Sequence, residues 1–341
     1  MNSDSVNDMP AVSIILPTYN RLRFLNEAIE AIRSQTFTEW ELIIVDDGST
    51  DGTKEFLEGR LKEIHQPWTY IYQENQGPSA ARNRGLEVAI GGFIAFYDSD
   101  DLWLPHHLAD CVRVLEENLD IDWVYSATKI VDYESGKEIS PNCFYVNGSP
   151  RPFLSRIYQR SEDLYVIPAR DALKIALVDA LYCGLQTSLI KSTFTSKHRL
   201  PPFAVGEDQV WSIQAAGKGL NFGCLSKVHV LYRQHSENIS SSPGKSILKN
   251  ISARLMMVSA FESLVTESRF SEPEIIALRK RLRDDLFWGV GYQYQALGMF
   301  ADARQAYLRA SKLFPLTWGQ YKTFLFSLPR NLLSLRRTNL K

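Results

Sequence analysis

The sequence is poor in cysteine, and its cysteines form no recognisable ligand or disulfide pattern. Four occur in 341 residues, and they are widely separated, at Cys111, Cys143, Cys183 and Cys224. There is no C-x-x-C pair, and we expect no histidine at ligand spacing from any of them. The pattern therefore predicts buried thiols in a reducing compartment.

Two other absences narrow the class of protein. No apolar run is long enough to cross a bilayer, and the polar, acidic segment from Met1 to Met9 is unlike a secretory signal. The formal net charge is only −1, and neither a Lys/Arg block nor basic residues interleaved with aromatic ones suggest a nucleic-acid groove. We therefore expect a cytoplasmic protein with no nucleic-acid partner. Peripheral contact with the inner face of the cytoplasmic membrane stays open.

What is present is an ordinary globular composition, with 45% hydrophobic and 11% aromatic residues. A chain of this length can bury one substantial core and leave material for a smaller appendage. We expect a disordered N-terminus over residues 1–10, a main domain over 11–240 and a helical extension over 241–341. The main domain divides into a half with β/α alternation, 11–110, and a second half, 111–240.

Three apolar strands in the first half each end in polar, turn-forming residues. The strands are Val12–Leu16, Glu41–Val45 and Gly91–Tyr97, and the polar clusters after them are 17–20, 46–52 and 98–101. Stretches with helical spacing lie between the strands. The alternation predicts an α/β fold with a mostly parallel sheet flanked by helices. Because ligands bind beyond the carboxyl ends of the strands in such sheets, we expect the three clusters to converge on one crevice.

The second half of the main domain has a different pattern. Strand signals at 123–127 and 129–133 lead to a turn at 134–137, which favours antiparallel pairing. Residues 140–172 contain four prolines and are predicted to be an irregular connection of the kind that often lies over a binding site. Strand and helix signals return at 183–235.

The cluster after the third strand holds three carboxylates, Asp98, Asp100 and Asp101. Like charges this close repel one another, and a buried strand end accepts them only with a cation or charge-assisted hydrogen bonds in return. Mn²⁺ or Mg²⁺ is the simplest compensation. Asp98 and Asp100 point the same way, because side chains repeat every two residues along an extended strand. The alternative is an aspartate-rich turn that caps the next helix.

Four segments carry a family resemblance through their order and spacing. They are Pro17-Thr18-Tyr19-Asn20, Val45 to Gly52, Asn75 to Gly85, and Asp98-Ser99-Asp100-Asp101. Together they closely resemble the inverting family 2 glycosyltransferases of the GT-A fold, over about residues 10–240. The resemblance implies a nucleotide-diphosphate sugar as the donor, with a UDP-sugar as the first candidate, and Mn²⁺ or Mg²⁺ as the cofactor.

The resemblance also implies roles for individual residues. Donor binding falls to residues at the strand ends and on the intervening helix: Pro17, Thr18, Tyr19, Asn20, Asp46, Asp47, Arg82, Asp98 and Ser99. Asp100 is the expected direct metal ligand, Asp98 would hold the ribose or a metal-bound water, and His235 would be a further ligand or would bind the leaving group. Asp208 resembles the general base that takes the proton of the acceptor hydroxyl.

A structural alternative stays open for several of these residues. Thr18, Tyr19 and Asp47 can merely cap turns, and Arg82 can lie on the surface. Asp208 can be a first-turn acid that favours a helix N-terminus.

The implied activity is metal-dependent, inverting transfer of one hexosyl or acetylhexosaminyl group to a hydroxyl of a glycan or a lipid-linked acceptor, as in cell-surface polysaccharide synthesis. No Gln/Arg-x-x-Arg-Trp motif of processive synthases follows Asp208, which favours one sugar per encounter. One alternative is a sugar-phosphate nucleotidyltransferase, although residues 16–24 lack the glycine-rich phosphate loop that such an enzyme normally needs. The other is a non-catalytic nucleotide-sugar-binding module.

The helical extension contains one tetratricopeptide-like helix pair. Its small, aromatic and proline positions are Phe287, Gly291, Tyr294, Gly298, Phe300, Ala303, Tyr307, Ala310 and Pro315. A single repeat cannot bury its own face, so we expect a helical hairpin packed on the main domain.

The end of the chain is basic and apolar. From Ala303 onward every charged residue is Lys or Arg, and apolar residues recur at roughly helical spacing from Phe324 to Leu335. This mixture predicts contact with an anionic membrane surface. The alternative is that the apolar residues dock on the catalytic domain and the charges stay solvated.

Overall fold

The protein is described here from a computed structural model that covers residues 9–178, 181, 183–238, 246–267 and 269–327. The chain divides into two units, residues 1–235 and 236–341. The predicted disordered segment lies almost entirely outside the described residues, and so does the predicted domain boundary at 240.

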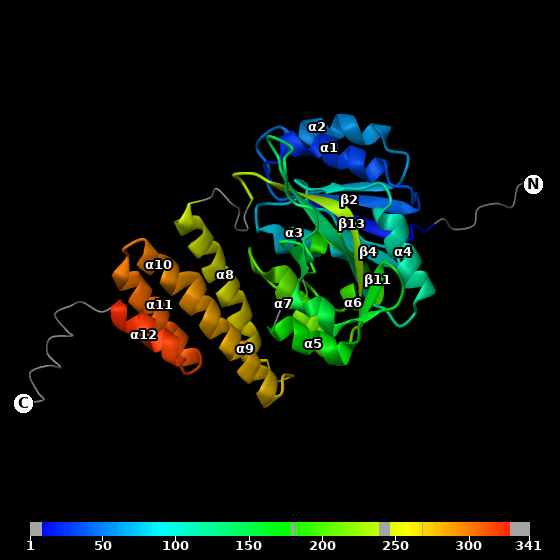
Figure 1. Ribbon diagram of the computed structural model, residues 1–341. Coiled ribbons are helices and arrows are strands. Elements are labelled where there is room, and N and C mark those ends of the chain that lie inside the picture. Colours follow the sequence, from blue (N-terminus) through cyan, green and yellow to red (C-terminus); the bar gives the residue numbers. More distant parts are fainter. Residues whose placement is uncertain (1–8, 179–180, 182, 239–245, 268, 328–341) are drawn as a thin grey trace, which may run out of the picture. The chain divides into compact units, whose positions relative to one another are not determined.

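The first unit is built on one mixed sheet (Figure 1). Its first four strands in the chain pair in parallel in the order β3-β2-β1-β4. Their bounds are Val12–Thr18 for β1, Trp40–Asp46 for β2, Trp68–Tyr72 for β3 and Phe93–Phe96 for β4. The connecting helices are α1 (Leu22–Arg33), α2 (Thr53–Arg60) and α3 (Pro78–Val88). This is the predicted β/α alternation, and it brings the carboxyl ends of β1, β2 and β4 to one edge of the sheet.

The sheet continues beyond β4 with strands of both directions, in the order β4-β12-β6-β13-β11-β10. Their bounds are Ser188–Lys191 for β12, Trp123–Asp132 for β6, Phe222–Gln234 for β13, Leu164–Ile167 for β11 and Tyr158–Gln159 for β10. Two short strands pair with this sheet: β5 (Leu102–Trp103) with β13, and β7 (Glu138–Ser140) with β6. Two more, β8 (Tyr145–Val146) and β9 (Ser149–Pro150), form a separate hairpin.

The remaining helices of this unit are α4 (His107–Glu117), α5 (Ala169–Val178), α6 (Ser192–Thr195) and α7 (Glu207–Gly217). Short 3-10 turns lie at Leu61–Glu63, Pro152–Arg156 and Leu185–Thr187.

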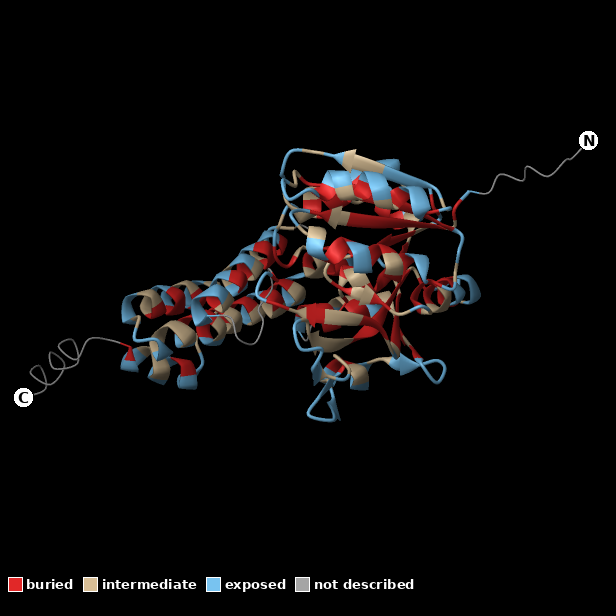
Figure 2. Cartoon of the chain, turned by 90° about the horizontal axis from the view of Figure 1, so that it is seen from above, coloured by how far each residue is buried: buried red, intermediate tan, exposed pale blue. Residues whose placement is uncertain are grey.

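Alternation along β1 sends its side chains to two cores, because successive residues of a strand point to opposite faces. Ile14 and Leu16 join apolar residues of α1, α2 and α4 in one large cluster. On the other face, Ile15 lies against Gly85 of α3. Farther along that face, the Trp211 ring of α7 meets the rings of Phe96 and Trp123. The strands in the middle of the unit are therefore buried on both sides, as their red colour in Figure 2 shows.

The sequence prediction was wrong in two parts of this sheet. Residues 140–172 do not form only an irregular connection, because β10 and β11 within this range belong to the main sheet. The segments 123–127 and 129–133 form one continuous strand, β6, with the hairpin to β7 following at the predicted turn. Strand β3 was not predicted, because its residues are exposed or half-buried and do not form an apolar run.

The second unit is helical. Its helices are α8 (Ile247–Val265), α9 (Glu272–Asp284), the π-helical turn η4 (Asp285–Gly291), α10 (Tyr292–Ala296), α11 (Phe300–Leu313) and α12 (Trp318–Phe326). The tetratricopeptide-like pair is formed by η4 and α10 with α11, and α8 and α9 pack against it. The Phe287 ring stacks on the Tyr307 ring, with centroids 4.2 Å apart. A Cβ atom at Gly291 would lie 2.4 Å from that same tyrosine ring, so glycine allows the two helices to approach.

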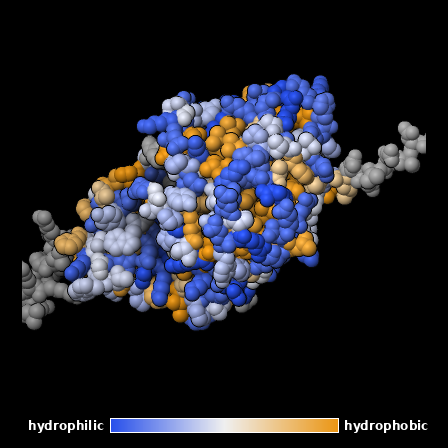
Figure 3. Space-filling model, turned by 45° about the vertical axis from the view of Figure 1, so that its right-hand side comes forward, coloured by the Kyte–Doolittle hydropathy of each residue, from blue (hydrophilic) through white to orange (hydrophobic). Residues whose placement is uncertain are grey.

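Apolar residues at the surface occur in separate groups between hydrophilic ones on the face drawn in Figure 3. Among the described residues, no helix combines the length and the apolar character that crossing a membrane requires.

Candidate functional site

The loops after β1 and β2 are joined to each other at the edge of the sheet. Thr18 is in register with Asp46, so the two strands end at the same level. The Asn20 backbone N–H donates to Ser49 Oγ at 2.9 Å, and Asn20 Oδ1 accepts from the Thr50 N–H at 2.8 Å. Asn20 has a φ of 51°, which asparagine tolerates better than most residues. The first two predicted clusters therefore meet, with the Tyr19 side chain left 47% exposed beside them.

Asp46 and Asp47 are both buried, and each organises a neighbouring segment. Asp46 accepts from the Ser49 N–H at 2.8 Å and from the Tyr70 hydroxyl at 2.9 Å. Asp47 accepts from the Gln73 side chain and from the backbone N–H groups of two residues, Gln76 and Gly77, at 2.7 to 2.9 Å. Asp47 thus does shape a turn, as the structural alternative holds. Two carboxylate oxygens offer about four acceptor positions, so one position remains for a ligand.

Arg82 connects three segments that are far apart in the sequence. It lies on α3, and its guanidinium donates to Asp98 Oδ1 at 2.7 Å and to Glu207 Oε1 at 3.0 Å. The residue is 6% exposed, so the alternative of a surface arginine is wrong. Burial opposes its charge, but attraction to Asp98 and Glu207 is stronger and raises the pKa of Arg82. Arg82 therefore stays positive and holds the strand end of β4 next to the start of α7.

Asp100 faces three basic side chains. Its Oδ2 atom lies 3.2 Å from His235 Nε2 and 3.8 Å from an Arg21 guanidinium nitrogen. Its backbone carbonyl accepts from Arg233 Nε at 2.5 Å. Burial favours the neutral acid, yet the hydrogen bond to His235 and the charge of Arg21 outweigh it and lower the pKa of Asp100. Asp100 is therefore ionised at neutral pH.

Asp101 behaves differently from its neighbour. It is 2% exposed, its Oδ1 atom accepts from the Arg233 N–H at 3.1 Å, and its Oδ2 atom has no hydrogen-bond partner. Burial and the negative charges of Asp100 and Asp98 raise the pKa of Asp101 well above its usual value. Asp101 thus keeps its proton over a wider pH range than Asp100 and is the poorer candidate for a metal ligand.

Asp208 lies in the first turn of α7. This helix begins directly after Gly206, whose φ is 87°. Its Oδ1 atom accepts from the Gln209 N–H at 2.7 Å. Burial, with the negative charges of Glu207 and Asp98 added, raises the pKa of Asp208 to about 7. A carboxylate with a pKa near neutrality can both accept and release a proton, which is what general base catalysis needs.

The aspartate cluster fits a divalent cation by the chemistry of its donors. Asp100 is ionised and 17% exposed at its side chain, and Asp98 is 28% exposed, so both carboxylates can be reached. Asp98, Asp100 and His235 do not form a group in which all ligand atoms lie within 4.8 Å of one another. A bound metal would therefore take its remaining ligands from elsewhere, and a diphosphate supplies oxygens of the required kind.

The structure brings most of the predicted site residues to one edge of the sheet. Pro17 and Thr18 end β1, and Ser99 is buried between the two half-buried aspartates Asp98 and Asp100. Arg21, which lies beside Asp100, and Glu27, which pairs with the Arg233 guanidinium, were not among the predicted site residues. No spacing rule could reveal these partners, because Arg82 and Glu207, like Glu27 and Arg233, are brought together by the tertiary fold.

Comparison with known proteins relates part of the chain to one family. The family model described as glycosyl transferase family 2 matches residues 13–163. Residues 13–163 therefore belong to this family.

Curated relatives carry related names. An uncharacterized glycosyltransferase of Rickettsia felis is 40% identical over 129 residues, which are 38% of this chain but only 21% of that protein. The putative teichuronic acid biosynthesis glycosyltransferase TuaG of Bacillus subtilis is 29% identical over 244 residues, 71% of this chain and 86% of TuaG. The UDP-Glc:alpha-D-GlcNAc-diphosphoundecaprenol beta-1,3-glucosyltransferase WfgD of Escherichia coli is 35% identical over 38% of this chain and 51% of WfgD. The match thus covers about a fifth of the Rickettsia protein, about half of WfgD and most of TuaG.

Solved structures confirm the predicted GT-A fold. Residues 1–349 of TarS from S. aureus, in complex with UDP-GlcNAc, superpose with a TM-score of 0.61 at 19% identity, covering 95% of this chain and 83% of that one. The mannosyltransferase PcManGT of Pyrobaculum calidifontis, in complex with GDP-Man and Mn²⁺, gives 0.56 at 18% identity, with 93% and 84% covered.

Proposed function

We propose that this protein is a metal-dependent, inverting glycosyltransferase that moves one sugar from a nucleotide-diphosphate donor to a hydroxyl group. The observation that carries the proposal is the Arg82 bridge. It joins Asp98, in the cluster suited to a metal, to Glu207, the neighbour of the candidate base Asp208. The groups for activating the acceptor and for holding the departing diphosphate are therefore held in one site.

The donor is proposed to be a UDP-sugar. The TarS structure contains UDP-GlcNAc and the PcManGT structure contains GDP-Man with Mn²⁺, so both proteins bind nucleotide-diphosphate sugars. In this chain the exposed Tyr19 ring is available to lie on a base, and Asp47 has an acceptor position free for a ring N–H or a ribose hydroxyl.

The proposed reaction is a single displacement at the anomeric carbon. Asp208 takes the proton of the acceptor hydroxyl as that oxygen attacks from the face opposite the leaving group, which inverts the configuration. Negative charge then develops on the nucleoside diphosphate. A divalent metal held by Asp100 and Asp98 would supply Lewis-acid stabilisation of that charge. Arg21 and Arg233 lie beside Asp100 and would add positive charge on the same side, and His235 Nε2 lies 3.2 Å from the Asp100 carboxylate.

A direct test is the assay of purified protein with a panel of UDP- and GDP-sugars, with Mn²⁺, with Mg²⁺ and with a chelator. We expect metal-dependent release of nucleoside diphosphate, and a product whose anomeric configuration, read by NMR, is opposite to that of the donor. Release of pyrophosphate from a nucleoside triphosphate and a sugar phosphate would instead indicate a nucleotidyltransferase. Donor binding without any turnover over an acceptor panel would favour the binding module.

The pH dependence should report on Asp208. Below its pKa of about 7 the residue is protonated and cannot accept the proton, so kcat/KM should fall as the pH drops through that value. The charge of Glu207 helps to raise this pKa, so Glu207→Gln should move the acidic limb to lower pH. Full pH profiles of kcat/KM for both proteins check this. An unmoved limb in Glu207→Gln would assign the titration to another group.

We also propose a glycan or lipid-linked acceptor, reached at an anionic membrane surface. WfgD is named for a diphosphoundecaprenol acceptor and TuaG for teichuronic acid synthesis, which supports cell-surface polysaccharide synthesis. On α12 the side chains of Trp318 and Phe326 are 74% and 80% exposed. Of the basic residues, Arg309 pairs with Glu262 and Arg304 donates to the Ser327 carbonyl, so fewer charges are available than the sequence suggests. Residues 328–341 of the basic segment lie outside the described residues.

Liposome co-sedimentation tests the membrane contact. We expect binding to vesicles rich in phosphatidylglycerol at low salt, weakened by salt, since each basic residue near the surface contributes about 1 kcal/mol. Trp318→Ser combined with Phe326→Ser should reduce it, whereas Tyr158→Ser, an exposed aromatic of the first unit, should not. No sedimentation of the wild type, or equal sedimentation of the double variant, would contradict this part of the proposal.

A further inference from the structure

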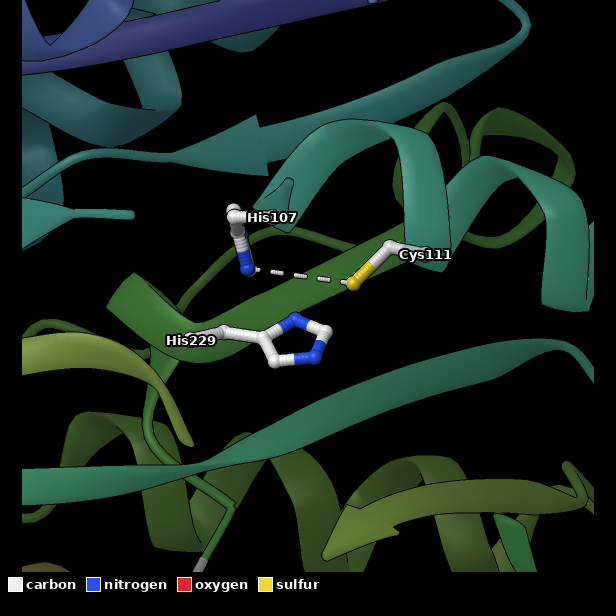
Figure 4. A group of neighbouring side chains, drawn as sticks. All are labelled: His107, Cys111 and His229. Carbon is white, nitrogen blue, oxygen red and sulfur yellow. Dashed lines mark hydrogen bonds between the residues drawn. The ribbon is translucent and has the colours of Figure 1, made fainter. Parts of the chain in front are cut away.

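A second group of metal-ligating side chains lies on α4 and β13, outside the site described above. His107 and Cys111 are one helical turn apart on α4, and His229 faces them from β13 (Figure 4). One ligand atom from each of the three lies within 4.8 Å of the others, and all three residues are 0% exposed. The sequence prediction that no histidine has ligand spacing to a cysteine is therefore wrong.

The two imidazoles are not satisfied by the protein. Neither ring nitrogen of His229 has a hydrogen-bond partner, and His107 Nε2 has none either. The remaining nitrogen of His107, Nδ1, lies 3.9 Å from Cys111 Sγ. Buried polar groups nearly always find a partner, and leaving one without costs about 1–3 kcal/mol. Each neutral imidazole carries one nitrogen with a free lone pair, so each of the two rings can offer one ligand atom to a metal cation beside the Cys111 sulfur.

The separations suit a tetrahedral ion. Zn²⁺ with bonds of about 2.0 Å to nitrogen and about 2.3 Å to sulfur places neighbouring ligand atoms roughly 3.5 Å apart. The His107–Cys111 distance of 3.9 Å is close to this value. Asp110 lies next to His229, with its Oδ2 atom 3.6 Å from His229 Nε2, but its carboxylate does not join His107 and Cys111 in one group of mutually close ligand atoms. His106, Asp110 and His229 also form a group with ligand atoms within 4.8 Å.

We propose that His107, Cys111 and His229 bind one Zn²⁺ ion that ties α4 to β13. The thiolate would cancel one positive charge of the ion, and the negative charge of Asp110, 3.6 Å from His229 Nε2, would offset part of the other. Binding converts the Cys111 thiol to a thiolate and releases one proton to solvent.

The ion would fix two segments that lead into the donor site. The chain runs from the Asp98–Asp101 cluster through β5 to His107, and β5 pairs with β13 through Trp103 and Val230. Near the other end of the site, His229 lies four residues before Arg233 on β13 and accepts from the Leu104 N–H at 2.8 Å through its backbone carbonyl. The inference concerns metal binding and does not depend on the proposed glycosyl transfer.

The opposing account is that the cluster needs no metal. The His107 ring packs on the Trp103 ring, with centroids 4.5 Å apart, so two neutral histidines could be held by aromatic contacts alone. The two accounts differ in what the wild-type protein binds, which can be measured without any variant.

The test uses full-length protein purified without a polyhistidine tag. We expect one zinc per chain by inductively coupled plasma mass spectrometry, restored by Zn²⁺ after removal, and a Tm about 5 °C lower in the metal-free protein. Replacement by Co²⁺ should give a thiolate-to-cobalt charge-transfer band, because the cluster contains a cysteine and the aspartate cluster does not. Absence of zinc after Zn²⁺ addition, with an unchanged Tm, would overturn the proposal.

Variants locate the ion. Cys111→Ser should lose the charge-transfer band and the zinc. Cys224→Ser should keep both, because Cys224 is a buried thiol on β13, the strand of His229, but is not one of the proposed ligands. Asp100→Asn should also keep them, which separates this ion from any metal at the donor site. A cobalt spectrum in Cys111→Ser equal to that of the wild type would overturn the assignment even if zinc is bound.

Discussion

Replacing Asp208 with Asn should lower kcat about 10²–10⁴-fold while leaving the affinity for the donor nearly unchanged. The amide keeps the shape of the carboxylate but cannot accept a proton from the acceptor hydroxyl. Donor affinity should survive because Asp208 lies on α7, whereas the predicted donor contacts lie at the ends of β1, β2 and β4. Steady-state kinetics and donor titration by calorimetry measure the two quantities separately.

Stability provides a control for this variant. A raised carboxyl pKa means that the folded state prefers the protonated form, so the stability from Asp208 is present at low pH and is lost as the pH rises through about 7. The Asp208→Asn variant has no carboxyl group to ionise at this position, so it does not lose this stability as the pH rises. The Tm of the variant at pH 8 should equal or exceed that of the wild type. A variant that is inactive and also less stable would not support a chemical role.

Glu207→Gln is the matched comparison, since this neighbour in the first turn contacts Arg82 but is not the proposed base. At alkaline pH it should retain most of the wild-type kcat. If Glu207→Gln loses activity as steeply as expected for Asp208→Asn, and Asp208→Asn stays active, the base is Glu207.

The strands and their polar ends could be predicted from the sequence because they depend on local patterns. Val12–Leu16 and Glu41–Val45 are apolar runs followed by turn residues, and the structure extends them only to Thr18 and Asp46. Strand β3 escaped prediction because it lies at the sheet edge, where one row of side chains meets solvent and the apolar signal is weak. The strands inside 140–172 are two to four residues long and are formed by pairing with β13 and with each other.

Candidate residues of the site could be named from the sequence, but their hydrogen-bond and ion-pair partners could not. The polar cluster after the third strand indicated Asp98 and Asp100 as candidates, because carboxylates at a strand end are conspicuous in a sequence. The family resemblance indicated Asp208. The partners that set their charge states come from distant segments, as Arg82 does for Asp98 and His235 does for Asp100. The roles of these residues in donor and metal binding stay predictions.

The His107–Cys111 pair illustrates the same limit in the second cluster. A spacing of four residues on a helix is visible in the sequence, but it becomes a ligand set only when β13 places His229 beside it. The position of His229 depends on the pairing of β13 with β5 and β6, and it cannot be predicted from the pattern of residues 107–111.

Replacing Asp100 with Asn should abolish metal-dependent donor binding and turnover together, with kcat/KM reduced by about 10³-fold or more. The variant keeps the shape of the side chain but removes the charged oxygen that a hard cation prefers, so Mn²⁺ and the diphosphate should both bind weakly. Asp101→Asn is the control, because Asp101 is buried, its pKa is raised by burial and by the charges of Asp100 and Asp98, and an amide oxygen can still accept from the Arg233 N–H. Donor titrations with and without Mn²⁺ should therefore separate the two variants by more than tenfold in affinity, a difference of about 1.4 kcal/mol. Unchanged Mn²⁺-dependent donor affinity and turnover in Asp100→Asn would remove this residue from the metal site and shift the assignment to Asp98.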